Sequence, residues 1–265
     1  MTMRASVEDT IPNWGPGLRS MRTTPANTLS TEAYDQLRAD VVSGRLPPGT
    51  KLTTKGVKER YGIGGSPMRE ALTRLAADGL LETEGQKGFT VVSASIGELA
   101  DIGRVRMQLE LQALSQAVKR GSVEWEVSVV SQFHRLQHAL EAPLTDGDEW
   151  EQTHRAFHFA LLSGCASPWL MHFCDRIYDQ TERYRRLYTS YERIPAKLMH
   201  SHKALLNAVL ARDLEKTLAL TRDHIAYATR QTLADMLAAG VTGDPAAETS
   251  IAELPGLGLI LSLKL

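Results

Sequence analysis

The spacing of apolar residues divides the chain into a short segment of mixed structure and a long helical one. Near the N-terminus, Tyr34, Leu37 and Val41 recur at helical spacing, which predicts a helix. Ser30 precedes them and is a residue type that favours the N-cap position. The Leu-Pro-Pro-Gly-Thr run at 46–50 then forces a turn, so this first helix is short.

Two further short helices are predicted, joined by a tight turn. The first covers 54–61, and the Gly-Ile-Gly-Gly run at 62–65 follows it. We assign Ser66 as the N-cap of the next helix, with Pro67 at its first position, where proline removes no hydrogen bond. Residues 80–92 then predict a strand, a glycine-containing turn and a second strand. This succession is typical of a winged helix-turn-helix.

From residue 95 onward the pattern is helical without any strand-like alternation. One long amphipathic helix is predicted over 95–119, and four or five more follow to about Leu237. The predicted fold class is therefore mainly α, an N-terminal winged helix-turn-helix followed by an all-α antiparallel helical bundle. The expected division is a flexible N-terminal arm (1–25), a DNA-binding domain (26–94), an all-helical domain for effector and metal binding and dimerisation (95–238), and an irregular C-terminal tail (239–265).

Composition and charge narrow the classes of function. In 265 residues, 43% of them hydrophobic, a substantial core can form, and no apolar run approaches the roughly 20 residues of a membrane span. We therefore expect a cytoplasmic protein without a membrane partner. Residues 26–94 carry nine Lys or Arg against eight Asp or Glu. Any affinity for DNA must then depend on where the charges lie.

Three motifs in the N-terminal segment are shared with a known protein family. They are a Leu-Pro-Pro-Gly turn at 46–49, Pro-x-Arg-Glu-Ala-Leu at 67–72 and Gly-Leu-Leu at 79–81. In this combination, residues 30–94 resemble the N-terminal domain of the GntR family of bacterial transcription regulators. The resemblance implies a bacterial protein that binds double-stranded DNA as a homodimer at a pseudo-palindromic operator and is associated with the nucleoid when it does so.

The predicted DNA contacts come from the short helices and the hairpin turn. A helix N-terminus suits a phosphate, and Arg69 is long enough to contact a guanine edge or a phosphate. By itself, Arg69 beside Glu70 is more typical of a solvated helix face, but the surrounding motif favours DNA contact. The family commonly carries Ser-Arg where this chain has Gly64-Gly65, so one base contact is expected to be missing. The predicted DNA-binding residues are Lys55, Ser66, Arg69, Thr73, Gly85, Lys87 and Gly88.

Histidines four residues apart occur twice in the helical segment, and that spacing places both imidazoles on one helix face. We interpret His134 and His138 as a mostly surface pair. The second pair is His154 and His158. The Phe-His segment at 157–158 and the two histidines at 202 and 224 are similar to motifs of the FCD ligand-binding domain. That domain follows the DNA-binding domain in the FadR-like branch of GntR regulators.

In many FCD domains an Asp and three His hold a divalent metal at the centre of the bundle. When this family pattern is transferred to the present sequence, the three imidazoles are those of His158, His202 and His224. His154 then occupies the position of the Asp. Four neutral imidazoles favour Zn, Ni or Cu over Mn or Mg. The predicted cofactor is thus a divalent transition metal, zinc first and nickel second. Alternatively, His154 points away and three histidines leave an open position.

The resemblance further implies a small carboxylate effector, oriented by the metal. Arg106 is the predicted second contact to it, and the competing interpretation is a surface pair with Glu110 at i,i+4. We interpret Arg183, Arg185 and Arg186 as solvated.

The predicted function is a DNA-binding transcription regulator, a repressor rather than an enzyme. A small organic acid, bound in a metal-containing pocket of the helical domain, would control its operator binding. Two alternatives stay open at this point. One is a metal-dependent hydrolase or lyase, for which Glu151 is the only candidate general base; the other is a DNA-binding protein whose metal site is purely structural.

Overall fold

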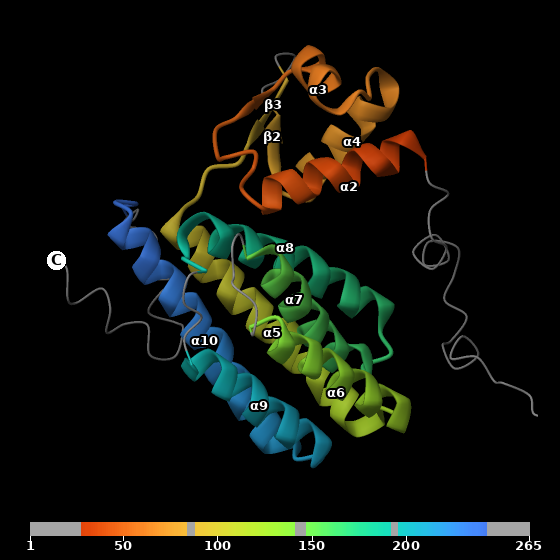
Figure 1. Ribbon diagram of the computed structural model, residues 1–265, viewed down its shortest axis with the longest axis vertical. Coiled ribbons are helices and arrows are strands. Elements are labelled where there is room, and N and C mark those ends of the chain that lie inside the picture. The colour runs from red at the N-terminus through yellow and green to blue at the C-terminus, as the bar shows by residue number, and fades with distance from the viewer. Residues whose placement is uncertain (1–27, 84–87, 141–146, 192–195, 243–265) are drawn as a thin grey trace, which may run out of the picture.

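A small head of mixed structure and a bundle of long helices follow one another along the chain (Figure 1). The computed structural model describes residues 28–83, 88–140, 147–191 and 196–242. The head contains α2 (Leu29–Val42), β1 (Lys51–Leu52), α3 (Thr54–Tyr61), α4 (Ser66–Ala77), β2 (Leu81–Thr83) and β3 (Phe89–Val91). The bundle contains α5 (Ile96–Arg120), α6 (Val123–His138), α7 (Asp148–Ser163), α8 (Pro168–Tyr188), α9 (Ala196–Leu210) and α10 (Leu214–Ala238). The predicted fold class is confirmed, with a mainly α chain and one small sheet.

The sheet of the head has a strand that the apolar pattern did not reveal. Its order is β1-β3-β2, with both pairs antiparallel, whereas the sequence predicted only the β2–β3 hairpin. Two residues, Lys51 and Leu52, are too few to show an alternation of apolar and polar positions. Gly88 explains how β1 fits, because a Cβ there would lie 3.0 Å from the carbonyl oxygen of Leu52.

Two predicted helix starts in the head are wrong by one or two residues. The N-cap of α2 is Thr28 rather than Ser30, and its hydroxyl accepts the Thr31 N–H at 3.3 Å. The N-cap of α4 is Gly65 rather than Ser66, with φ 69° and ψ −141°. Ser66 is therefore the first residue of α4, and its hydroxyl has no capping role.

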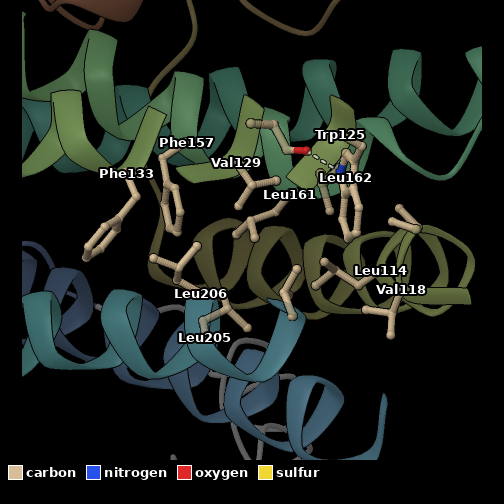
Figure 2. Close-up of a cluster of buried hydrophobic side chains, with 14 of the residues drawn as sticks. Leu114, Val118, Trp125, Val129, Phe133, Phe157, Leu161, Leu162, Leu205 and Leu206 are labelled. Carbon is tan, nitrogen blue, oxygen red and sulfur yellow. Dashed lines mark hydrogen bonds between the residues drawn. The ribbon is translucent and has the colours of Figure 1, made fainter. Parts of the chain in front are cut away.

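The bundle is held together by an apolar cluster between α5, α6, α7 and α9, shown in Figure 2. Phe133 and Phe157 meet with their ring centroids 5.4 Å apart, and Trp125 donates its indole N–H to the carbonyl of Ala160 at 2.8 Å. Capping side chains begin four of the helices: Ser95, Ser122, Ser167 and Asp213. Among the described residues, no helix is long and apolar enough to cross a membrane.

Polar contacts fix the head on α8. Arg38 of α2 forms a two-pronged ion pair with Asp179, and Arg176 pairs with Asp78 at the end of α4. Gln180 donates to the carbonyl of Asp78 at 3.1 Å. These contacts of α8 help to orient the head against the bundle, and α2 lies beside α8 in Figure 1.

Candidate functional site

Four histidines meet in the interior of the bundle. His154 and His158 come from α7, His202 from α9 and His224 from α10, and all four are buried. One ring nitrogen from each lies within 4.8 Å of the others. We call these residues the quartet. The other pair at this spacing, His134 and His138, is exposed on α6, as expected.

Two distances within the quartet are close to those expected around a tetrahedral ion. The Nε2 atom of His154 lies 3.1 Å from Nε2 of both His158 and His202. Metal–nitrogen bonds of about 2.0–2.1 Å in a tetrahedron correspond to nitrogen–nitrogen separations of about 3.3 Å. His154 therefore points into the cluster, and the alternative in which it turns away does not describe this structure.

The outer ring nitrogens of the quartet have partners that set the orientation of the rings. The hydroxyl of Tyr178 lies 2.9 Å from Nδ1 of His154, and the hydroxyl of Ser201 lies 2.9 Å from Nδ1 of His224. Such outer contacts commonly fix the tautomer and direction of metal-binding imidazoles.

Burial keeps the imidazoles of the quartet neutral. It lowers the pKa of His202 to about 3 and the pKa values of the other three well below the ordinary 6.5. The neighbouring cations Arg106 and Arg185 lower the pKa of His202 further. Neutral imidazole is the form that binds a metal, and the donor set contains no carboxylate. The residues thus fit a divalent transition metal of the zinc or nickel type.

Two buried arginine–glutamate pairs stand beside the quartet. Arg106 donates to Glu110 at 2.6 Å with both side chains buried, so the predicted surface pair exists but is an interior one. Arg185 binds Glu151 with two nitrogens, at 3.0 and 2.7 Å. Glu151 also accepts the hydroxyl of Tyr191 at 2.6 Å, so its oxygens are occupied and it is poorly suited to act as a general base.

The prediction that the arginines near the end of α8 are solvated is wrong. Arg183 and Arg185 are buried, and only a tenth of the Arg186 side chain is exposed. Arg183 donates to the carbonyl of Val92 at 3.2 Å. A run of charged residues normally indicates a solvated face, but here the head covers part of α8 and the bundle covers the rest.

Several buried donors around the quartet have no hydrogen-bond partner. In the part of the chain that the structure describes, six buried side-chain nitrogen or oxygen atoms lack one, and four of the six surround this site. These four are Nη2 of Arg106, Nη1 of Arg185, Nε1 of Trp150 and Nδ1 of His202. Because an unpaired buried donor is costly, these atoms are suited to bind the acceptor oxygens of a ligand or of water.

Sequence reasoning found Arg106 but missed Trp150, Tyr178 and Arg185. Trp150 lies one helical turn before His154, so its position beside the quartet was readable from the spacing alone. Its ring stacks on that of His154, with centroids 4.3 Å apart and planes at 17°.

The candidate DNA-contacting face lies on α3 and α4. Lys55, Ser66, Arg69 and Thr73 are all exposed, while the opposite face of α4 is buried in the head. The hydroxyl of Thr73 donates to the carbonyl of Arg69 at 2.9 Å, within the helix. Gly85 and Lys87 lie outside the described residues. Gly88 is described, and its lack of a side chain is already required by the approach of β1.

Comparisons with known proteins match both parts of the chain. Residues 29–91 match the model of bacterial regulatory proteins of the gntR family, and residues 101–227 match the FCD domain. A transcriptional regulator of Paraburkholderia xenovorans, BphR, is 41% identical over 75% of this chain and 82% of its own length. The transcriptional repressor GlaR of Escherichia coli is 35% identical over 74% of this chain and 92% of its own.

The chain belongs to the GntR family. The solved structure of E. coli McbR agrees, with a TM-score of 0.66 and 26% identity over 81% of this chain and all of that one. Members of the family are DNA-binding transcription regulators rather than enzymes. This chain is accordingly a DNA-binding transcription regulator with an FCD effector-binding domain, and the prediction that it is not an enzyme is confirmed.

Family membership also gives the site residues their context. GntR regulators bind DNA operators and typically dimerise, and FCD domains often bind metals. Within the described part of this GntR chain, the quartet is the cluster that can hold a metal. It lies inside the matched FCD segment, and the exposed face of α4 lies inside the matched gntR segment.

Proposed function

We propose that this regulator is a homodimeric repressor whose operator binding is controlled by a small organic acid bound beside a divalent metal ion. The quartet, His154, His158, His202 and His224, would hold the ion, with zinc favoured over nickel. The observation that carries the proposal is the convergence of four buried neutral imidazoles next to donors that lack a partner.

Charge balance is the reason to expect an acid. Four neutral imidazoles leave the two positive charges of a divalent ion uncompensated in the interior, which is costly. Neither neighbouring arginine needs an external anion to balance its charge, because Arg106 is paired with Glu110 and Arg185 with Glu151. A bound carboxylate would offset the charge of the ion and accept from Nη2 of Arg106.

Helix α8 supports a route from this site to the head. Tyr178 contacts His154 of the quartet, and the next residue, Asp179, holds Arg38 of the head. A ligand that moves the quartet or its outer partners would therefore shift α8, and with it the head. In a dimer this would change how two copies of α4 meet a pseudo-palindromic operator.

Two measurements test the proposal. Wild-type protein purified without chelators should contain about one zinc or nickel per chain by elemental analysis, and the double variant His202→Ala, His224→Ala should contain none. Metal-free wild-type protein would contradict the proposal.

The DNA side is tested separately. Arg69→Ala should abolish protection of the operator in a footprinting experiment, while folding and oligomeric state are unchanged. Arg222→Ala removes an exposed arginine from α10 instead and should leave protection intact. Sequence-specific protection retained by Arg69→Ala would contradict the assignment of α4 as the helix that contacts bases.

A further inference from the structure

The side chain of Lys58 lies across the turn that joins α3 to α4 in the head (Figure 1). A Cβ added at Gly64 would lie 2.8 Å from Cδ of Lys58, 3.0 Å from its Cγ and 3.3 Å from its Cε. The aliphatic chain of Lys58 therefore occupies the space that a side chain at residue 64 would fill. Nζ is one bond beyond Cε, so the positive charge lies beside the turn, close to the start of α4.

Lys58 differs from the other two cations of α3 in its surroundings. Nζ of Lys55 lies 3.9 Å from a carboxylate oxygen of Glu59, and Arg60 pairs with Asp40 at 3.2 Å. Within the described residues, Lys58 forms no ion pair, and its side chain is exposed. Its aliphatic chain is nevertheless held against Gly64 while the charged end stays in solvent. The ammonium is thus positioned without being neutralised by an acid of the same chain.

The turn that Lys58 crosses contributes no polar side chain of its own. Residues 62–65 are Gly, Ile, Gly and Gly. Lys58 follows Lys55 by one helical turn, so the two side chains leave α3 on the same face. On the other side of the turn, Ser66 and Arg69 are exposed on α4. Lys58 therefore supplies a positive charge in the middle of a face that would otherwise carry charge only at its two ends.

We propose that Lys58 is a further DNA-contacting residue of this regulator, which binds a backbone phosphate of the operator, and that Gly64 positions it. This inference rests on the proposed function above, in which α3 and α4 form the DNA-contacting face. A lysine ammonium is a compact point charge with rotatable donors, which suits a phosphate oxygen. A phosphate contact strengthens binding to every DNA sequence and makes the affinity depend on salt.

The experiment measures the salt dependence of DNA binding by the full chain. One probe is a duplex that the wild-type protein selects from a random pool, the other is an unrelated duplex of equal length, and fluorescence anisotropy gives both affinities. In Lys58→Ala, binding to both probes should weaken about tenfold. The slope of log affinity against log salt concentration should shrink by about 0.9 for each chain bound.

Two further variants show whether the charge at this position is what matters. Lys58→Arg keeps a cation on a chain of similar length, so it should keep the salt dependence of the wild type. Lys216→Ala removes an equal charge from the exposed face of α10, in the bundle, and should bind both probes like the wild type.

Gly64→Ala tests the placement of the lysine. Gly64 has no positive φ, so alanine fits its backbone, and the atoms nearest to the added Cβ all belong to the flexible side chain of Lys58. The substitution should weaken binding at least about twofold in the wild type and cause no further loss in Lys58→Ala, because the two residues act through one contact. Equal losses in both backgrounds would overturn the positioning role of Gly64.

The outcomes separate this inference from the proposed function. If Lys58→Ala binds both probes with the affinity and salt slope of the wild type, the inference is overturned. Arg69→Ala that still abolishes operator protection would then leave the proposed DNA-contacting face standing. A loss confined to the selected duplex would indicate a base contact and would overturn the assignment to a phosphate. Operator protection retained by Arg69→Ala would contradict the proposed face itself.

Discussion

At the scale of single residues, Gly65 decides what the N-terminus of α4 offers to DNA. Its φ of 69° combined with a ψ of −141° lies outside the backbone regions that residues with a side chain normally adopt. The arginine that the family commonly carries at this position therefore cannot be introduced here without moving the start of the helix. Recognition in this chain is expected to depend instead on Arg69 and on its exposed neighbours Ser66 and Lys55.

Gly62 provides a matched test of the backbone at Gly65. It has the same φ of 69° but a ψ of −2°, a left-handed conformation that Asn adopts readily, and an added Cβ would meet no atom within 4 Å at either position. Gly65→Asn should lower the free energy of unfolding by about 1–3 kcal/mol, and Gly62→Asn by less than about 1 kcal/mol. Urea denaturation measures both. Equal losses would show that backbone strain at Gly65 is not the cause.

The quartet could be predicted from residues alone, whereas its surroundings could not. Helical spacing and family motifs located all four histidines, because both are local properties of the sequence. Arg185 was interpreted as solvated, since local patterns do not show that another domain will cover a charged helix face. The buried donors without a hydrogen-bond partner could not be predicted either, because a missing partner is recognised only when the positions of all neighbouring residues are known.

At the scale of elements, α8 connects the two parts of the chain. Tyr178 and Asp179 are consecutive, so their side chains leave the helix about 100° apart, one towards the quartet and the other towards the head. Asp179 is shared by Arg38 of the head and Arg155 of α7. The helix was predictable from its apolar spacing, but its role as the support for the head was not, because long-range ion pairs leave no periodic signal.

Removing the charge of Asp179 should uncouple the head from the metal site. In Asp179→Asn, the head should unfold in its own calorimetric transition, and zinc should no longer raise the temperature of that transition. Asp175→Asn is the matched control one turn earlier, since Asp175 pairs with Arg155 and is more exposed. It should keep the coupling of the wild type. If zinc still raised the unfolding temperature of the head in both variants, α8 would transmit the signal without the Arg38 contact.

At the scale of the whole molecule, the quartet joins three helices, of which α7 is separated from the other two by the whole of α8. Residues of α7, α9 and α10 each contribute to it, so an ion bound there cross-links the bundle. A ligand that binds only the folded state stabilises it in proportion to the logarithm of its concentration over Kd. The Tm of the whole chain therefore reports whether an ion is bound at this one site.

The two pairs of histidines at i,i+4 spacing allow a controlled test of this stabilisation. With zinc at about a thousand times Kd, the gain is about 4 kcal/mol, which for a chain of this size raises the Tm by about 10 °C. The zinc-dependent rise in Tm should disappear in His154→Ala, His158→Ala and persist in His134→Ala, His138→Ala, because the latter pair lies exposed on α6. Differential scanning calorimetry with zinc and with a chelator measures the rise directly. If the exposed pair reduced it as much as the buried one, the stabilisation would come from zinc bound at the surface, and the quartet would not be the site.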